Sequence, residues 1–282
     1  MEINTFRSLM KKKLKSDKPK NDVTEFIKSY LYVPKETAEA IYNYFLEQHS
    51  FLEIPDEDSI IIEKFTDNEK NQEKKYLIFH ALYGRRVNDA LSRAIGYIIG
   101  ALGGRDIELG VSDNGFYLSG ENMMLKRAIE NLKEKNLEKF LKEAIDRTDV
   151  LARRFRHCAT RSLMILRNYK GQRRTVGKQQ MKSHFLLAAV KKISNEFPIL
   201  REARREIFED LMDIENAKLI LHWIEQGKVK IKTIETRVPS PFALNLILQG
   251  HSDLIRIEDK QAFLRRMHQL HIENIMQAGV LS

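Results

Sequence analysis

The basic side chains of this sequence are concentrated in one segment whose charge is suited to holding a polyanion. Between Leu151 and Lys192 there are twelve Lys and Arg residues and no Asp or Glu. The whole chain has a formal net charge of +9 at pH 7, so the remainder sums to 9 − 12 = −3. Clustered Lys and Arg displace condensed counterions from a phosphate backbone, which makes nucleic acid the leading candidate partner. The twelve residues are Arg153, Arg154, Arg156, Arg161, Arg167, Lys170, Arg173, Arg174, Lys178, Lys182, Lys191 and Lys192.

The residue spacing in this segment predicts two helices joined by a loop that contains glycines. Within Val150–Tyr169, apolar residues from Leu151 to Leu166 recur on one helical stripe, and Arg153, His157 and Arg161 form a second stripe at i, i+4 spacing. A second helix is predicted over Val176–Ile193, and the loop between them offers backbone amides as well as basic side chains to phosphates. The residues expected to contact nucleic acid are Arg153, Arg156, Arg161, Arg167, Arg173, Arg174 and Lys178.

Other interpretations of the basic segment remain open at this point. The acidic stretch Glu202–Asp213 follows closely and would pair with the basic helices in ordinary surface salt bridges. Alternatively, the basic helices dock an acidic protein partner or a motor domain, which would make the chain an interaction scaffold. A hydrolytic enzyme that acts on nucleic acid would need suitably spaced carboxylates, and no spacing in the sequence supports one.

Several classes of site are excluded by the motifs. Gly171–Lys178 resembles a phosphate-binding P-loop only superficially, because the interval between its glycines is one residue too long and Gln179 replaces the Ser or Thr that binds magnesium. Cys158 is the only cysteine and is expected to be a core thiol. Neither a metal-binding motif, nor a signal peptide, nor an apolar run near the roughly 18 residues of a membrane span is visible. We therefore expect a cytoplasmic chain without membrane contact, metal, cofactor or visible catalytic motif.

Hydrophobic periodicity and turn signals predict an α+β fold with a small mixed or antiparallel sheet. Residues 1–120 are expected to form an α+β part in which two strand pairs flank a buried helix (ββαββ-like). Residues 121–282 are expected to be mainly helical with one late strand, and both parts to form one combined accessory domain. Asp113-Asn114-Gly115 is a strong hairpin signal. The expected elements are strands Ile60–Phe65, Lys75–Leu82, Ile107–Val111, Phe116–Leu118 and Lys228–Arg237, the buried helix Val87–Leu102 and a last helix Ile257–Ile275.

Several stretches stand in consistent order within the region from about Ala38 to Phe242: Phe79–Leu91, Val111–Phe116, Val150–Gly171, Val176–Met181, Phe197–Glu206 and Thr236–Ala243. Together they resemble one family, the large helicase-related (Lhr) proteins in their archaeal form. The resemblance implies that this region is the DEAD/H-associated domain of an ATP-dependent, 3′-to-5′ superfamily 2 DNA helicase linked to DNA repair. It also implies single-stranded or junction DNA as partner, with RNA as a further candidate, beside a RecA-like motor and a winged helix. The motor motifs are not in this sequence, so ATP and Mg²⁺ are expected to act only through a separate motor domain.

Overall fold

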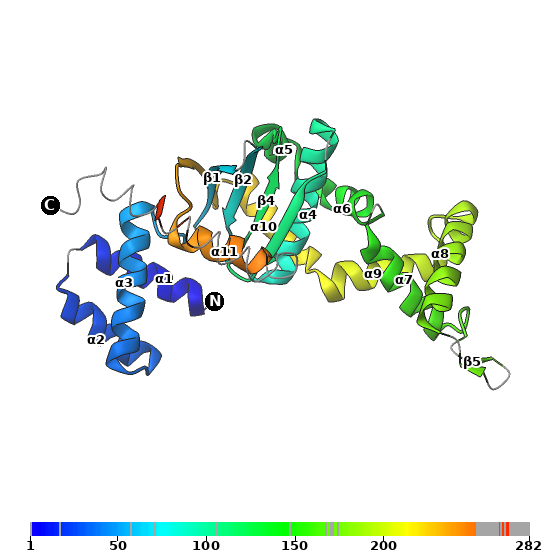
Figure 1. Cartoon of the computed structure of the whole chain (residues 1–282), viewed down its shortest axis with the longest axis horizontal. Helices are drawn as coiled ribbons and strands as arrows, with labels where there is room; N and C mark the ends of the chain where they lie inside the picture. The colour runs from blue at the N-terminus through cyan, green and yellow to red at the C-terminus, as the bar shows by residue number, and fades with distance from the viewer. Residues whose placement is uncertain are drawn as a thin grey trace. The chain divides into compact units, whose positions relative to one another are not determined.

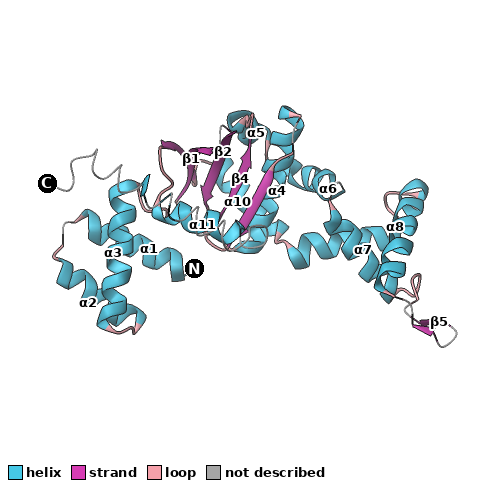
Figure 2. Ribbon diagram, viewed as in Figure 1, coloured by secondary structure: helices cyan, strands magenta, loops and turns pink. Residues whose placement is uncertain are grey.

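The fold is α+β, as expected, and the chain forms two compact units (Figures 1 and 2). Unit 1 comprises Met1–Asn88, Arg105–Met123 and Trp223–Ser282, and unit 2 comprises Asp89–Gly104 and Met124–His222. The two units interleave along the sequence, and the expected division at residue 120 remains a prediction. The computed structural model describes residues 2–16, 18–56, 58–69, 72–104, 106–146, 148–166, 168–169, 172–173 and 175–251, together with Arg265, Met267, Gln269 and Leu270.

Three helices at the start of unit 1 pack around an aromatic cluster. They are α1 (Glu2–Lys15), α2 (Lys20–Leu31) and α3 (Lys35–Phe51), and α3 contacts both of the others. Phe6 and Phe45 meet edge to face with ring centroids 5.5 Å apart, an arrangement that adds stability beyond burial alone. The buried members of the cluster are Phe6, Met10, Val23, Ile27, Ala38, Tyr42, Phe45, Ile54 and Phe242.

The sheet of unit 1 has the strand order β3-β4-β2-β1-β7 and is mixed. All neighbouring strands are antiparallel except β7, which pairs in parallel with β1. Both faces carry buried apolar side chains, because residues alternate between the faces along each strand. The strands are β1 (Ser59–Glu69), β2 (Gln72–His80), β3 (Glu108–Ser112), β4 (Gly115–Gly120) and β7 (Lys230–Thr236).

The predicted hairpin joins β3 to β4, and Gly115 makes it possible. Ser112 pairs with Gly115, so Asp113 and Asn114 form a two-residue turn. Gly115 has a φ of 154°, and a Cβ atom there would lie 2.1 Å from the carbonyl oxygen of Phe79 on β2. A glycine is therefore required at this position, where β4 begins beside β2.

Helix α11 (Pro241–His251) covers one face of the sheet and was not predicted from the sequence. Ser240 caps it, since its hydroxyl accepts a hydrogen bond from the Ala243 N–H at 3.3 Å, and Pro241 occupies the first turn. Residues of α11 pack against Phe65, Tyr76, Ile78 and Tyr117 of the strands. The expected last helix, Ile257–Ile275, lies outside the described residues except for Arg265, Met267, Gln269 and Leu270, which are helical.

A fully buried carboxylate, Glu63 on β1, ties this part of unit 1 together. Its oxygens lie 3.1 Å from Nε2 of His80 and accept hydrogen bonds from the Ser240 N–H (2.7 Å), the Ser240 hydroxyl (2.8 Å) and the Thr236 hydroxyl (3.0 Å). Burial alone would raise the pKa of Glu63, but the hydrogen bond and charge of His80 and the hydrogen bonds from Ser240 together lower it. The ionised carboxylate thus joins β1 to β2, to the end of β7 and to the start of α11.

Unit 2 is helical in its described residues apart from a short two-stranded hairpin. The predicted buried helix corresponds to α4 (Arg85–Gly103), whose Ala90, Ala94 and Ile99 are completely buried. Among the described helices of the chain, none combines the length and hydropathy that a membrane-spanning helix requires. The remaining elements are α5 (Leu125–Asn131), η1 (Glu134–Asn136), α6 (Leu137–Asp146), α7 (Asp149–Arg161), β5 (Asn168–Tyr169), β6 (Gln172–Arg173), α8 (Val176–Ile193), α9 (Pro198–Arg205), η2 (Glu206–Leu211) and α10 (Ile214–Glu225).

Candidate nucleic-acid interface

Helix α7 carries the first basic stripe, but it is shorter than predicted. It ends at Arg161, eight residues before the expected end at Tyr169. Leu163 adopts a φ of 59°, and the N–H of the buried Ile165 donates back to the carbonyl of Ala159, so the chain folds over the helix end. The expectation that Leu166 lies on the apolar stripe of this helix is wrong, because it follows this reversal and is exposed.

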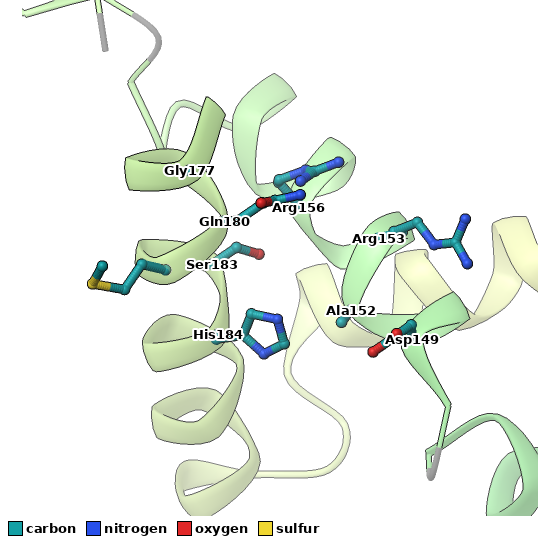
Figure 3. Close-up of a pocket in the computed structure, with 9 residues that line it drawn as sticks. Asp149, Ala152, Arg153, Arg156, Gly177, Gln180, Ser183 and His184 are labelled. Carbon is teal, nitrogen blue, oxygen red and sulfur yellow. The ribbon is translucent and has the colours of Figure 1, made fainter. Parts of the chain in front are cut away.

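Helices α7 and α8 pack against each other as an antiparallel hairpin and enclose a groove of about 480 Å³. Figure 3 shows Gln180, Ser183 and His184 extending from α8 toward α7. Gly177 lies at the same end of the groove as Arg156, and Asp149 lies at the other end (Figure 3). The lining residues are Asp149, Ala152, Arg153, Arg156, Gly177, Gln180, Met181, Ser183 and His184.

Three of the residues predicted to contact nucleic acid lie on this hairpin, and their charged groups form no ion pair within the described part of the protein. Arg153 and Lys178 are exposed and Arg156 is half-buried. No ion pair connects any of them to another described residue, although acidic side chains are frequent elsewhere in unit 2. We call Arg153, Arg156 and Lys178 the α7–α8 ridge.

Arg161, a fourth predicted contact residue, forms an ion pair with a buried carboxylate of the protein. Both Arg161 and Arg154 form ion pairs with Glu206, whose side chain is only 4% exposed. The Arg154 Nη1 lies 3.2 Å from the Glu206 carboxylate. Glu206 belongs to the acidic stretch that the sequence offered as a salt-bridge partner, so that interpretation holds for this pair of arginines.

Two other carboxylates of the acidic stretch, Glu202 and Glu209, form ion pairs with Arg205 of the same stretch. Arg205 donates to Glu202 at 2.8 Å and to Glu209 at 2.7 Å. The hydrogen bond from Arg205 lowers the pKa of Glu202, and these two carboxylates raise the pKa of Arg205. Arg204 binds Asp146 through both carboxylate oxygens at 3.2 and 3.0 Å. None of these carboxylates pairs with Arg153, Arg156 or Lys178, and the α7–α8 ridge has no acidic ion-pair partner among the described residues.

The other three residues predicted to contact nucleic acid lie outside the part of the chain whose side chains are described. Arg167 and Arg174 lie outside the described residues, and Arg173 is described only as part of β6. Their role stays a prediction.

The outer face of α8 carries large apolar side chains that the charge pattern did not reveal. Phe185 and Ile193 are each 72% exposed, and Met181, which also lines the groove, is 61% exposed. They share this face with Lys178, at helical spacing. The signal in the sequence was the even distribution of apolar residues around this helix. In the structure, Ser183 and Val190 are the only buried residues of α8.

No group of three or more His, Cys, Asp or Glu side chains in the described part of the chain is arranged to hold a metal ion. Cys158 is buried in α7, as predicted.

The sequence pattern of the family described as DEAD/H associated matches residues 54–243. The chain belongs to this family. The DEAD/H-associated chain is 48% identical over 276 residues to the ATP-dependent helicase Lhr-Core of Methanothermobacter thermautotrophicus, and 38% identical over 288 residues to that of Saccharolobus solfataricus. These matches cover 98% and 99% of the chain but 32% of each relative, so it spans about a third of their length.

A solved structure supports the same assignment of this DEAD/H-associated chain. The Mycobacterium smegmatis helicase Lhr, solved bound to ssDNA and AMP-PNP, is 27% identical and superposes with a TM-score of 0.66. The superposition covers 76% of the chain and 27% of that helicase. The expected membership of the Lhr family is thereby confirmed.

Glu206 offers a test of how far the buried ion pairs stabilise unit 2. Glu206→Gln should lower the free energy of unfolding by about 2 kcal/mol, less than the ~3–5 kcal/mol of a fully buried pair, because Arg161 remains 62% exposed. Glu209→Gln is the matched control, since it removes the same charge from an exposed ion pair that solvent screens. Denaturant unfolding followed by circular dichroism measures both, and equal effects would argue against a structural role for Glu206.

Proposed function

We propose that this chain is the nucleic-acid-binding accessory domain of an Lhr-type helicase and grips single-stranded DNA through the α7–α8 ridge. The observation that carries the proposal is the presence of three cationic side chains without an acidic partner among the described residues. The binding of ssDNA by the M. smegmatis relative supports the same ligand class. On this proposal the chain holds the DNA strand beside a RecA-like motor and a winged helix. ATP and Mg²⁺ act at the motor, and the assembled helicase takes part in DNA repair.

A salt titration tests this function directly. Anisotropy of a labelled single strand should report binding whose log K falls with log salt at a slope of about −2, since each of three phosphate contacts contributes about 0.7. Unlabelled duplex, junction DNA and RNA, added as competitors, then rank the possible ligands. Binding that does not respond to salt, or no binding at low salt, would exclude a phosphate grip.

The outer face of α8 favours a second candidate, which is docking of the rest of an Lhr-type protein. Exposed Met181, Phe185 and Ile193 beside lysines suit a protein surface that is both apolar and acidic. Phe185→Asp should reduce co-elution with separately expressed motor domains by about tenfold, because it removes a central aromatic contact, while affinity for single strands stays unchanged. Loss of DNA affinity in this variant, with docking intact, would assign the face to nucleic acid instead.

A further inference from the structure

The groove between α7 and α8 has two chemically different ends. At one end lie Arg156 and the first turn of α8, where helix N–H groups lack intrahelical partners and favour anions. Among the described residues, no atom outside the backbone of α8 itself lies within 4 Å of the Cβ position at Gly177, so this backbone is open to approach. At the other end lie Asp149 and His184. Seven residues of α7 separate Arg156 from Asp149, which is roughly 10 Å along the helix.

Ser183 lies between these ends and is the strongest sign that the groove receives a ligand. The residue is only 3% exposed, yet its hydroxyl has no hydrogen-bond partner among the described residues. The hydroxyl faces the groove in Figure 3. A buried hydroxyl without a partner is unfavourable, so a ligand that supplies a donor or acceptor here would be stabilised.

The charge of Asp149 determines which part of a ligand fits the end of the groove where this residue lies. A carboxylate repels phosphate and accepts hydrogen bonds only, so it suits the exocyclic amino group of a base. Adenine, cytosine and guanine carry such a group, whereas thymine and uracil do not. A phosphate at the Arg156 end and a base edge at the Asp149 end would satisfy both ends of the groove.

We propose that this groove receives one nucleotide of a bound single strand, with its phosphate at Arg156 and Gly177 and its base edge at Ser183 and Asp149. The proposal rests on the proposed nucleic-acid grip and deepens it. The groove adds a preference for bases that carry an amino group. The α7–α8 ridge alone would contact phosphates and bind all base sequences with the same affinity.

Binding of the full chain to labelled strands of equal length tests the proposal. The strands are homopolymers of deoxyadenosine, deoxycytidine and deoxythymidine and an abasic strand, and free dAMP serves as competitor to separate a strand-bound from a free nucleotide. The wild type should prefer the first two strands. Asp149→Asn should weaken binding to them by about tenfold, the loss expected for one charge-assisted hydrogen bond, and leave the other two unchanged or slightly tighter. Ser183→Ala should weaken binding to every base-bearing strand and not to the abasic one.

Asp210→Asn is the matched control, because it removes the same charge from an exposed position outside the groove. Unchanged thermal unfolding of each variant shows that the fold is intact. If Asp149→Asn tightens all four strands equally, the carboxylate acts only as a charge and the nucleotide site is refuted. If the wild type binds every strand alike but in a salt-dependent way, the groove proposal fails and the grip survives. Absence of all binding would refute the grip as well.

Discussion

Replacing both Arg153 and Arg156 with Glu should weaken the binding of single-stranded DNA by about a hundredfold or more. Each guanidinium is expected to make one charge-assisted hydrogen bond to phosphate, worth about 1.5 kcal/mol or more, so losing both costs about 3 kcal/mol. The slope of log K against log salt should also become shallower by about 1.4, since two phosphate contacts are lost. Neither arginine pairs with a carboxylate of the described residues, so stability should change little.

Anisotropy with a labelled single strand measures this effect, and the control is Lys126→Glu combined with Arg127→Glu. Both control positions are exposed on α5 in the same unit, and the change in net charge is identical. A general electrostatic effect would weaken both double variants alike. Comparable affinities in the two would mean that the α7–α8 ridge is not the binding surface.

Replacing Glu63 with Ala should lower the free energy of unfolding of unit 1 by roughly 3–5 kcal/mol, the usual cost of removing one partner from a buried ionic network. His80, the Ser240 N–H and hydroxyl, and the Thr236 hydroxyl would all lose an acceptor where water is excluded. Glu235→Ala is the matched control on the neighbouring strand β7, because its side chain is 80% exposed and pairs only with Lys64 among the described residues. A small effect at Glu63, no larger than this control, would contradict the role of the carboxylate.

The same carboxylate should make stability depend on pH. Because the pKa of Glu63 in the folded chain is lowered from its ordinary value of 4.5, its contribution is complete above about that pH. The contribution is lost as the pH falls further and the folded carboxylate takes up a proton. Urea unfolding at a series of acidic pH values should therefore show a steeper loss in the wild type than in Glu63→Ala.

Local signals predicted most elements, and long-range contacts account for the errors. The buried helix α4 and the hairpin at Asp113-Asn114 follow from hydrophobic periodicity and turn chemistry, which act over a few residues. The end of α7 depends on Ile165 folding back into the core, which no local pattern indicates. Helix α11 is absent from the expected elements because Pro239 and Pro241 favour a rigid extended turn, although a Ser followed by Pro is also typical of a helix start.

The sequence predicted where the basic residues of the candidate site lie, but not which of them form ion pairs within the protein. Charge and helical spacing identified Arg153, Arg156 and Lys178, which are available on the hairpin. That Arg161 pairs with Glu206 depends on the packing of η2 against α7, which brings together residues 45 apart in sequence. The groove and Ser183 likewise need two helices in register, so sequence alone could not indicate them.

The parallel pairing of β7 with β1 affects how the chain folds as it leaves the ribosome. Ser59 pairs with Lys230, and 230 − 59 = 171 residues separate the two positions. At typical synthesis rates β1 therefore waits roughly 10–30 s for this neighbour, while the whole of unit 2 emerges. During that interval the edge of β1, with Ile60 and Ile62 beside it, is open to pairing with other nascent chains. Slow synthesis through unit 2, or truncation before Lys230, should therefore favour aggregation over native folding.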